Sequence, residues 1–272
     1  MGASDYFNQV GVAYDAHRPG YPDELIDHAI GVAELKAGDP VVEIGPGTGQ
    51  LTAMLAARGL KVTAVEPGAE LIALARQKVD AEFIHARLED AELPAGHFKA
   101  AFAASAINHP DPDVSWQLLH RALAPGGTLA LISYYGLAAD DDQPAQLAAW
   151  AEVAHELAAR FPQLRDLDTL SAGIRERSAN VSEAWAWFGR YDVARDYAAQ
   201  LFDDVQLATV TLTMERTAEQ TSGFMSTNPS WGQLTSGQQR ELTSRIQDLA
   251  ASLGRPLRSS TVAVLVTAKA RR

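Results

Sequence analysis

An apolar segment that ends in a glycine-rich loop constrains the fold of this chain more than any other feature. Residues 40–44 (PVVEI) form a short apolar run, which leads directly into the loop GPGTGQ at 45–50. The residues that follow place Leu51, Met54 and Leu55 at helical spacing. This order predicts a buried strand, a tight turn and a helix, which together form one βα unit of a parallel sheet.

The same unit recurs through the first half of the chain. Residues 61–65 predict a second strand, and residues 69–79 predict the helix after it. We expect three further strands at 83–86, 100–104 and 128–133. One more helix is expected at 116–123. Strands that alternate with helices at this spacing are typical of an α/β fold with a doubly wound, mostly parallel sheet. Ligands of such folds bind beyond the carboxyl ends of the strands.

The second half departs from this alternation. Residues 134–200 read as helices, with predicted spans of 143–161, 170–179 and 181–190, and we interpret residues 136–200 as a helical lid insertion. The entry to the lid carries Asp140, Asp141 and Asp142, which we interpret as a solvated loop and the start of a helix. Two late strands are predicted at 205–214 and 260–268, with a helix at 236–253 between them. They complete a seven-stranded sheet with an antiparallel edge. We therefore expect one domain, 1–272. It comprises a helical cover (1–35), a cofactor-binding core (36–135), the lid (136–200) and an antiparallel sheet edge with the last helix (201–272).

Charge and composition exclude several functions. The 23 Lys and Arg against 34 Asp and Glu give a net charge of −11, which would repel a polyanion, so we expect no nucleic acid partner. The absence of cysteine excludes disulfides, thiolate metal sites and a cysteine nucleophile. Neither a secretory signal nor an apolar run of membrane-spanning length is apparent. We therefore expect a cytoplasmic protein with no membrane partner.

Two acids near the glycine loop suggest what binds there. Glu66 ends the second strand, 19 residues after Gly47, where a carboxylate can accept hydrogen bonds from both hydroxyls of a ribose. Glu43 lies inside an otherwise apolar strand, where burial is costly unless the carboxylate meets a partner or a cation. A dinucleotide fingerprint would place glycine at position 50, which is occupied by Gln50. The pattern therefore indicates a nucleoside ligand with a positively charged group.

These residues resemble the class I S-adenosylmethionine-dependent methyltransferases. The resemblance is carried by E-x-G-x-G-x-G from Glu43, the acid after the second strand, and Pro-Gly-Gly at 125–127. The opening Y-x-x-x-R-P-x-Y-P from Tyr14, and Gly-Phe-Met-Ser-Thr at 223–227, resemble the small-molecule branch that includes trans-aconitate-type enzymes. The resemblance implies S-adenosylmethionine as cofactor and no metal. The implied cofactor contacts are Tyr14, Arg18, Glu43, Gly45, Pro46, Gly47, Gly49, Gln50, Glu66, Pro67, Leu88, Glu89 and Ser105.

The chain departs from that branch at two loops. After the third strand, Arg87 stands where the branch often carries the acid that meets the adenine amino group. The Leu88 backbone and the carboxylate of Glu89 or Asp90 are left as candidates. After the fourth strand, the branch tends to read S-A-x-H-W-x-D. Here the residues 105–111 read SAINHPD, so the histidine is displaced by one position to His109 and the tryptophan is absent.

Methyl transfer to a protonated nucleophile needs a base, and histidine has the ordinary pKa that suits this task. The candidates are His109 in the loop after the fourth strand, His155 on the lid, and His17 beside Arg18. Glu152 lies three residues before His155 and could orient its imidazole. Aromatic residues in the lid favour a hydrophobic or aromatic substrate, namely Trp150, Trp185, Trp187, Phe188 and Tyr191.

We therefore expect transfer of a methyl group from S-adenosylmethionine to an O, N or C atom of a small hydrophobic or aromatic metabolite, as in natural-product biosynthesis. Two alternatives stay open. The first is a cyclisation or rearrangement that depends on the same cofactor, coupled to methylation or in place of it. The second is a non-catalytic partner subunit that only binds the cofactor. A small-molecule substrate is the expected partner, and a homo-oligomer stays open.

Overall fold

The computed structural model describes residues 3–189 and 191–272, and the chain forms two compact units. The first, here called the helical unit, comprises Met1–Pro19, Gly136–Leu167 and Thr211–Val262. The second, the sheet unit, comprises Gly20–Tyr135, Asp168–Val210 and Ala263–Arg272. The expected cover (1–35) and lid (136–200) therefore each contribute to both units.

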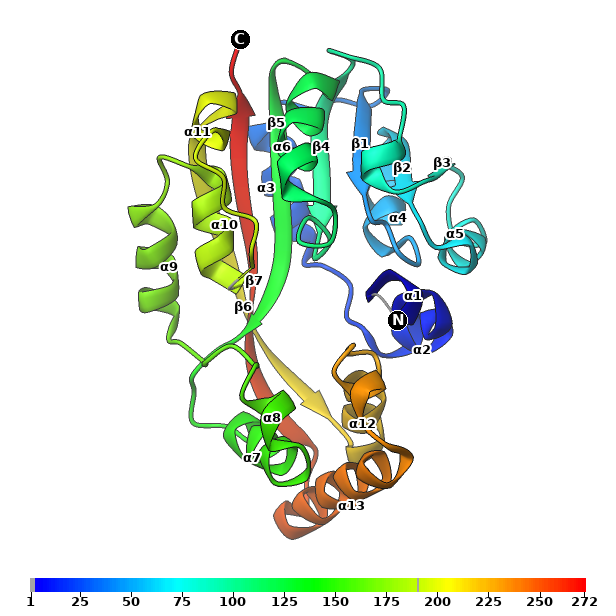
Figure 1. The fold of residues 1–272 in the computed structure, drawn as a ribbon, viewed down its shortest axis with the longest axis vertical. Helices are drawn as coiled ribbons and strands as arrows, with labels where there is room; N and C mark the ends of the chain where they lie inside the picture. Colours follow the sequence, from blue (N-terminus) through cyan, green and yellow to red (C-terminus); the bar gives the residue numbers. More distant parts are fainter. Residues whose placement is uncertain (1–2, 190) are drawn as a thin grey trace. The chain divides into compact units, whose positions relative to one another are not determined.

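The sheet has seven strands in the order β3-β2-β1-β4-β5-β7-β6. The pairs β1–β2, β2–β3, β1–β4 and β4–β5 are all parallel. Figure 1 shows that β7 runs opposite to β5, so the sheet is mixed, as predicted. The strand bounds are β1 (Pro40–Ile44), β2 (Lys61–Glu66), β3 (Glu82–His85), β4 (Phe98–Ala104), β5 (Leu123–Gly136), β6 (Phe202–Arg216) and β7 (Leu257–Ala270).

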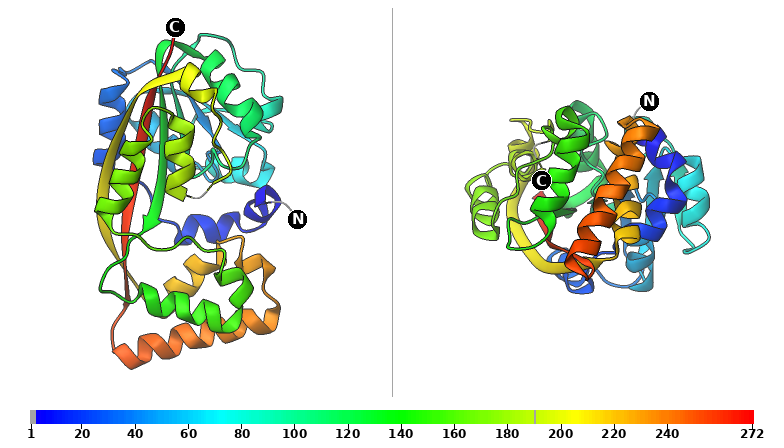
Figure 2. Two further views of the ribbon diagram at one scale, coloured as in Figure 1. Left: turned by 60° about the vertical axis from the view of Figure 1, so that its left-hand side comes forward. Right: turned by 90° about the horizontal axis from the view of Figure 1, so that it is seen from below.

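Helices cover both faces of the sheet, and Figures 1 and 2 show α3 and α6 on opposite sides of it. On the α3 face, Leu25 and Ile26 of α3 and Leu51 and Leu55 of α4 pack against the strands in one apolar core that includes Phe102. The helices of the sheet unit are α3 (Asp23–Val32), α4 (Gln50–Ala57), α5 (Ala69–Ala75), the 3₁₀ turn η1 (Leu88–Asp90), α6 (Pro112–Ala122), α9 (Leu167–Glu176, whose first residue belongs to the helical unit), α10 (Val181–Gly189) and α11 (Ala198–Leu201).

The helical unit has its own core. Trp150 is buried among apolar residues of α13 that include Leu242 and Ile246. Capping boxes at Thr217 and Thr235 begin α12 and α13, because each threonine accepts from the main chain three residues on, where a glutamine side chain accepts in return. The helices are α1 (Ala3–Gln9), α2 (Gly11–His17), α7 (Gln143–Val153), α8 (His155–Ala158), α12 (Ala218–Ser226), the 3₁₀ turn η2 (Trp231–Gln233) and α13 (Ser236–Leu253).

Several predicted bounds differ from the structure, and the predicted helices 69–79 and 116–123 are observed as α5 (Ala69–Ala75) and α6 (Pro112–Ala122). The predicted helix 143–161 breaks at Ala154, whose φ of −150° is not helical, and ends at Ala158. The fifth strand begins at Leu123 and not at 128, because a bulge between Phe98 and Ala100 accommodates Pro-Gly-Gly inside the β4–β5 ladder. The predicted helix 181–190 is observed over its described residues as α10 (Val181–Gly189), and Arg190 lies outside the described residues.

The prediction of a solvated Asp140–Asp142 loop was wrong for two of its three residues. Asp142 is buried and holds Arg255 through both carboxylate oxygens, at 2.6 and 3.0 Å, while it also accepts from the Arg258 N–H. Asp141 accepts from the Ser260 N–H at 2.5 Å. The aspartates therefore attach the start of α7 to the start of β7, a pairing over more than 110 residues that local polarity cannot reveal.

Candidate functional site

The glycine loop between β1 and α4 has the backbone that its sequence predicts. Gly45, Gly47 and Gly49 all have positive φ, of 63°, 56° and 82°. A Cβ at Gly45 would lie 2.6 Å from the Cβ of Ala106, and one at Gly49 would lie 2.8 Å from that of Ala75. A Cβ at Gly47 would meet nothing within 4 Å. Gly45 and Gly49 thus allow close packing inside the protein, whereas Gly47 leaves its open side to a ligand.

Glu66 is hydrogen-bonded to this loop. Glu66 is buried at the end of β2, and its two carboxylate oxygens accept from the Gly47 N–H at 3.1 Å and the Gly68 N–H at 2.8 Å. Burial raises the pKa of Glu66, and the two backbone donors oppose that rise. Each oxygen keeps a second lone pair, so the carboxylate can still accept from ribose hydroxyls. Of the neighbouring candidates, Pro46 is buried, Gln50 begins α4 half-buried, and Pro67 is exposed.

Glu43 is a buried carboxyl on β1. It is 1% exposed, and its Oε2 accepts from the Thr52 hydroxyl of α4 at 2.7 Å. Burial raises the pKa of Glu43 from its ordinary 4.5 to about 8, an effect that the Thr52 bond reduces and the charge of Glu66 increases. At neutral pH the group is therefore held mostly as the neutral acid, and a cation nearby would favour its ionisation.

Glu89 links two loops of the sheet unit. Its Oε1 accepts from Arg87 at 3.0 Å and from the Asp111 N–H at 2.8 Å. Burial alone would raise the pKa of Glu89, but these bonds outweigh it and the pKa is lowered. The Leu88 side chain is buried, and a contact of its backbone with a ligand stays a prediction. The loop after β3 thereby fixes the loop after β4.

The loop after β4 carries two further candidates. Ser105 has a positive φ of 56°, and its Oγ lies 2.9 Å from Ser133 Oγ of β5. His109 is exposed on this loop, and its main chain is held by a bond from its N–H to Ala106 O at 3.0 Å. Surrounding protein atoms partly desolvate the imidazole and lower the pKa of His109 below 6.5. The ring is therefore neutral at pH 7, which is the form that a base requires.

In the helical unit, two quoted motifs meet although they lie over 200 residues apart. Arg18 Nε donates to Thr227 Oγ1 at 2.7 Å, and the guanidinium lies 4.8 Å from the Phe224 ring centre and 5.1 Å from that of Tyr14. His17 lies against Gly223, where a Cβ would come within 2.4 Å of the imidazole. Residues of the opening motif and of the Gly-Phe-Met-Ser-Thr motif thus pack against each other. The contact of Tyr14 and Arg18 with the cofactor stays a prediction.

The other lid residues separate. His155 begins α8 and is exposed. Its proposed partner Glu152 instead forms an ion pair with Arg245 of α13. Trp150 packs on Phe161 and Trp231 in the helical unit, whereas Trp187 lies in the sheet unit on Gly173 and under Arg177. Trp185, Phe188 and Tyr191 form a separate cluster in the sheet unit.

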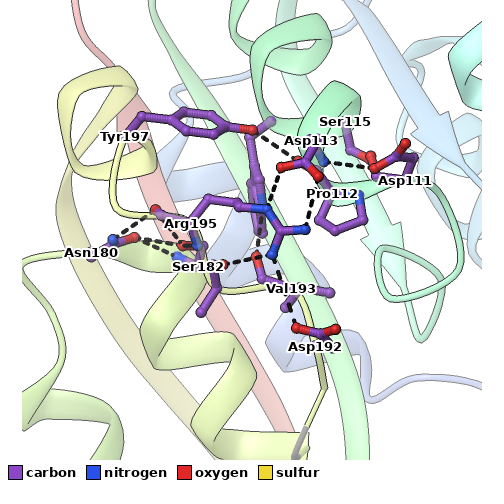
Figure 3. A network of polar contacts seen from close by, with 12 residues as sticks. Asp111, Pro112, Asp113, Ser115, Asn180, Ser182, Asp192, Val193, Arg195 and Tyr197 are labelled. Carbon is purple, nitrogen blue, oxygen red and sulfur yellow. Dashed lines mark hydrogen bonds and ion pairs between the residues drawn. The ribbon is translucent and has the colours of Figure 1, made fainter.

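Sequence reasoning missed a polar network that surrounds Arg195 (Figure 3). Arg195 donates to both oxygens of Asp113 at 2.5 and 3.2 Å, Tyr197 donates to Pro112 O at 2.9 Å, and the Trp116 indole donates to Val193 O at 2.9 Å. These bonds attach residues 191–197, here called the strap, to the start of α6. The partners lie 77 to 85 residues apart, and only the Asp-Pro-Asp helix start at 111–113 was visible as a local signal.

A seven-stranded sheet of this order, with an open glycine at its first turn and a buried acid at the end of β2, defines a class of nucleoside-cofactor-binding α/β folds. Residues 41–127 match the family model described as a methyltransferase domain. Over residues 41–127 the chain is therefore similar to a methyltransferase domain. The open side of Gly47 lies beside the Glu66 carboxylate at the carboxyl end of the sheet, where ligands of such folds bind.

Comparisons with individual proteins agree with this domain. An uncharacterized methyltransferase of Mycobacterium bovis is 34% identical over 121 residues, or 44% of this chain and 48% of the relative. A ribosomal RNA small subunit methyltransferase A of Anaeromyxobacter is 31% identical over 162 residues, or 59% of this chain and 55% of the relative. The chain thus spans about half the length of these relatives. The structure of a putative type II methyltransferase from Anaeromyxobacter dehalogenans has a TM-score of 0.62 at 22% identity and covers 94% of this chain and 97% of its own.

Among the described residues, every helix is too short or too polar to span a membrane. Within residues 3–189 and 191–272, no group of three or more His, Cys, Asp or Glu side chains is arranged to hold a metal ion.

Proposed function

We propose that the chain transfers a methyl group from S-adenosylmethionine to an O, N or C atom of a small hydrophobic or aromatic molecule, without a metal. The observation that carries this proposal is the pairing of the buried Glu66 carboxylate with the Gly47 N–H, beside the one glycine of the loop that is open to a ligand. When bound, the cofactor supplies a methyl group activated by a sulfonium. The residues of this chain bind it, orient it and exclude water.

Each residue has a distinct part in this proposal. Glu66 accepts the ribose hydroxyls, and the Gly47 side of the loop receives the amino-acid end. Glu43 responds to the positive charge from inside the sheet, since a cation favours its ionised form. The Leu88 backbone and Glu89 flank the adenine, and Ser105 lies at the end of β4. Tyr14 and Arg18 are proposed to cover the cofactor.

His109 is the proposed base for a protonated nucleophile. It lies on the loop after β4, and its lowered pKa keeps the imidazole neutral at pH 7. His155 and His17 remain the alternatives, with weaker support, because His155 has lost Glu152 to Arg245 and His17 is packed against Gly223. An anionic or electron-rich nucleophile would need no base, because position and desolvation would suffice.

A small molecule is favoured over RNA by charge. One relative carries a ribosomal RNA name, but it matches only part of this chain. The net charge of −11 opposes the binding of a polyanion, whose affinity rests mainly on Lys and Arg contacts with phosphates. The small-molecule branch of trans-aconitate-type enzymes remains the proposed relationship. Location in the cytoplasm and assembly into a homo-oligomer are predictions that the arrangement of the site does not address.

Methyl transfer and its two alternatives are separated by the fate of a labelled methyl group. Transfer of label from labelled S-adenosylmethionine to candidate acceptors supports the proposal. A changed product without label supports rearrangement, tight binding without turnover supports a partner subunit, and label in RNA overturns the small-molecule assignment.

Cofactor binding is tested separately by calorimetry with S-adenosylhomocysteine. We expect Glu66→Gln to weaken binding by roughly tenfold or more, because a charged acceptor for two hydroxyls is lost. Glu92→Gln, at an exposed position on the same chain, is the matched control. Equal affinity of the Glu66→Gln variant and the wild type would overturn the assignment of Glu66.

A further inference from the structure

An aromatic cluster lies over the carboxyl end of β5 in the sheet unit. The rings of Trp185 and Phe188, both on α10, have centres 5.1 Å apart. The Tyr191 ring stacks near Trp185 at 6.4 Å and 29°, and Tyr135 of β5 packs on Phe188 at 5.5 Å. Ser133 lies two residues before Tyr135, on the same face of the strand. Apolar rings and hydroxyl groups therefore share this end of the sheet.

Trp185 has a buried donor with no acceptor. Its side chain is fully buried, and its indole Nε1 has no hydrogen-bond partner among the described residues. Trp116 provides the comparison within the same unit, since it is equally buried and its Nε1 donates to Val193 O at 2.9 Å. An unsatisfied buried donor lowers the stability of the fold, so a fold that keeps one calls for an explanation. A ligand atom that arrives at Trp185 would remove this cost.

A line of hydroxyl groups runs from the glycine loop to the same cluster. Ser105 Oγ lies 2.9 Å from Ser133 Oγ, and Ser133 shares a side-chain hydrogen bond with Tyr191. Ser105 is next to Ala106, whose Cβ lies beside Gly45 of the glycine loop. Burial raises the pKa of Tyr191, so its phenol remains a neutral donor at neutral pH. The line therefore joins the flank of the proposed cofactor loop to a protonated tyrosine.

The position of Tyr191 is fixed from both sides. The strap, which begins with Tyr191, is attached to α6 by the Asp113–Arg195 pair and the Tyr197 bond (Figure 3). The bond from the Trp116 indole to Val193 O also attaches it. On the other side, a Cβ at Gly189 would lie 2.0 Å from the Tyr191 ring, so the ring fits only above a glycine. A side chain held in this way loses little entropy when it binds a ligand.

We propose that the Trp185 N–H and the Tyr191 hydroxyl bind an oxygen of the methyl-accepting substrate, which is an aromatic compound with a phenol or carbonyl oxygen. The inference rests on the proposed function. The half-buried Tyr191 ring takes the apolar part of the substrate, and the two neutral donors take the lone pairs of its oxygen. A compound of the same shape without that oxygen leaves the Trp185 N–H without a partner and is discriminated against.

Nitrogen-15 spectra of the tryptophan indoles test this directly. The probes are 2-naphthol and 2-methylnaphthalene, which differ by a hydroxyl in place of a methyl group, each added in the presence of S-adenosylhomocysteine. We expect 2-naphthol to shift the Trp185 signal, identified by its loss in Trp185→Phe, and to bind about tenfold more tightly than 2-methylnaphthalene. Trp185→Phe and Tyr191→Phe should each reduce that preference. Trp187→Phe, on the same helix but packed on Gly173, should keep it.

The opposite results would overturn the inference. It is wrong if 2-naphthol leaves the Trp185 signal unmoved, or if both the Trp185→Phe and Tyr191→Phe variants keep the full preference for 2-naphthol. Label transfer to an acceptor that does not move the signal would retain methyl transfer and refute this oxygen site. A shifted signal without transfer of label from S-adenosylmethionine to any acceptor would retain the oxygen site and count against the proposed function.

Discussion

Replacing Glu43 with glutamine is expected to flatten the pH dependence of the stability of this protein. The folded protein holds a proton on Glu43 up to about pH 8, whereas the unfolded chain releases it near its ordinary pKa of 4.5. Between these values the folded state binds more protons, so the free energy of unfolding falls as pH rises. Glutamine has nearly the same shape, can accept the Thr52 bond and does not titrate.

The size of the effect follows from the pKa shift. Each unit of pH contributes about 1.4 kcal/mol while the two states differ by one proton. The wild type should therefore lose about 4 kcal/mol relative to Glu43→Gln between pH 5 and pH 8. Nearly all of this difference should be present by pH 8, because Glu43 is ionised in both states above its folded pKa.

Urea unfolding of both proteins at several pH values between 5 and 8 measures this difference. Glu82→Gln is the matched control, because Glu82 also accepts from a threonine hydroxyl, that of Thr63 at 2.8 Å, but is exposed on β3. The control should have a stability curve parallel to that of the wild type. A Glu43→Gln curve that is also parallel to the wild type would refute the conclusion that Glu43 is neutral in the folded protein.

Three further predictions concern the loops. Gly49→Ala should destabilise the fold by about 2 kcal/mol or more in chemical unfolding, because its Cβ would lie 3.1 Å from the Ala75 backbone. Gly96→Ala, also at positive φ but in open space, should cost about 1 kcal/mol, and equal losses would contradict the packing argument. His109→Ala should lower kcat by roughly 10²–10⁴-fold with unchanged affinity for S-adenosylhomocysteine, and a variant with near-normal kcat would exclude His109 as the base. The kcat/KM of the wild type should fall only below pH 6.5, because the pKa of His109 is lowered. Arg195→Ala should speed proteolysis within residues 191–197, and Arg175→Ala, exposed on α9, should not; equal cleavage rates would show that the Asp113 pair does not hold the strap.

Patterns within a few residues were enough to predict the glycine loop and the acid beside it. The β1 strand was predicted with its observed bounds, and the tight turn after it and the place of Glu66 at the end of β2 followed from the strand, glycine and acid spacing. The reason is that each βα unit is local, so its signals lie next to one another in the chain.

The remaining features depend on pairs that no local pattern contains. Asp142 was predicted to be solvated, but it pairs with Arg255 in the turn between α13 and β7. Glu152 was the proposed partner of His155, but it pairs with Arg245 of α13. The Arg195–Asp113 pair joins positions 82 residues apart. Side chains of this kind obtain their roles from tertiary contacts, which a single sequence read for periodicity does not specify.

The place of β7 between β5 and β6 has a consequence for synthesis on the ribosome. A chain emerges from its amino end, and β6 leaves the tunnel well before residues 257–270 exist. During that interval β6 has no neighbour in the sheet, and the outer edge of β5 is open as well. Exposed strand edges are sites of aggregation. This half of the sheet must therefore close after translation of β7, and chaperones that shield open edges should matter most in that interval.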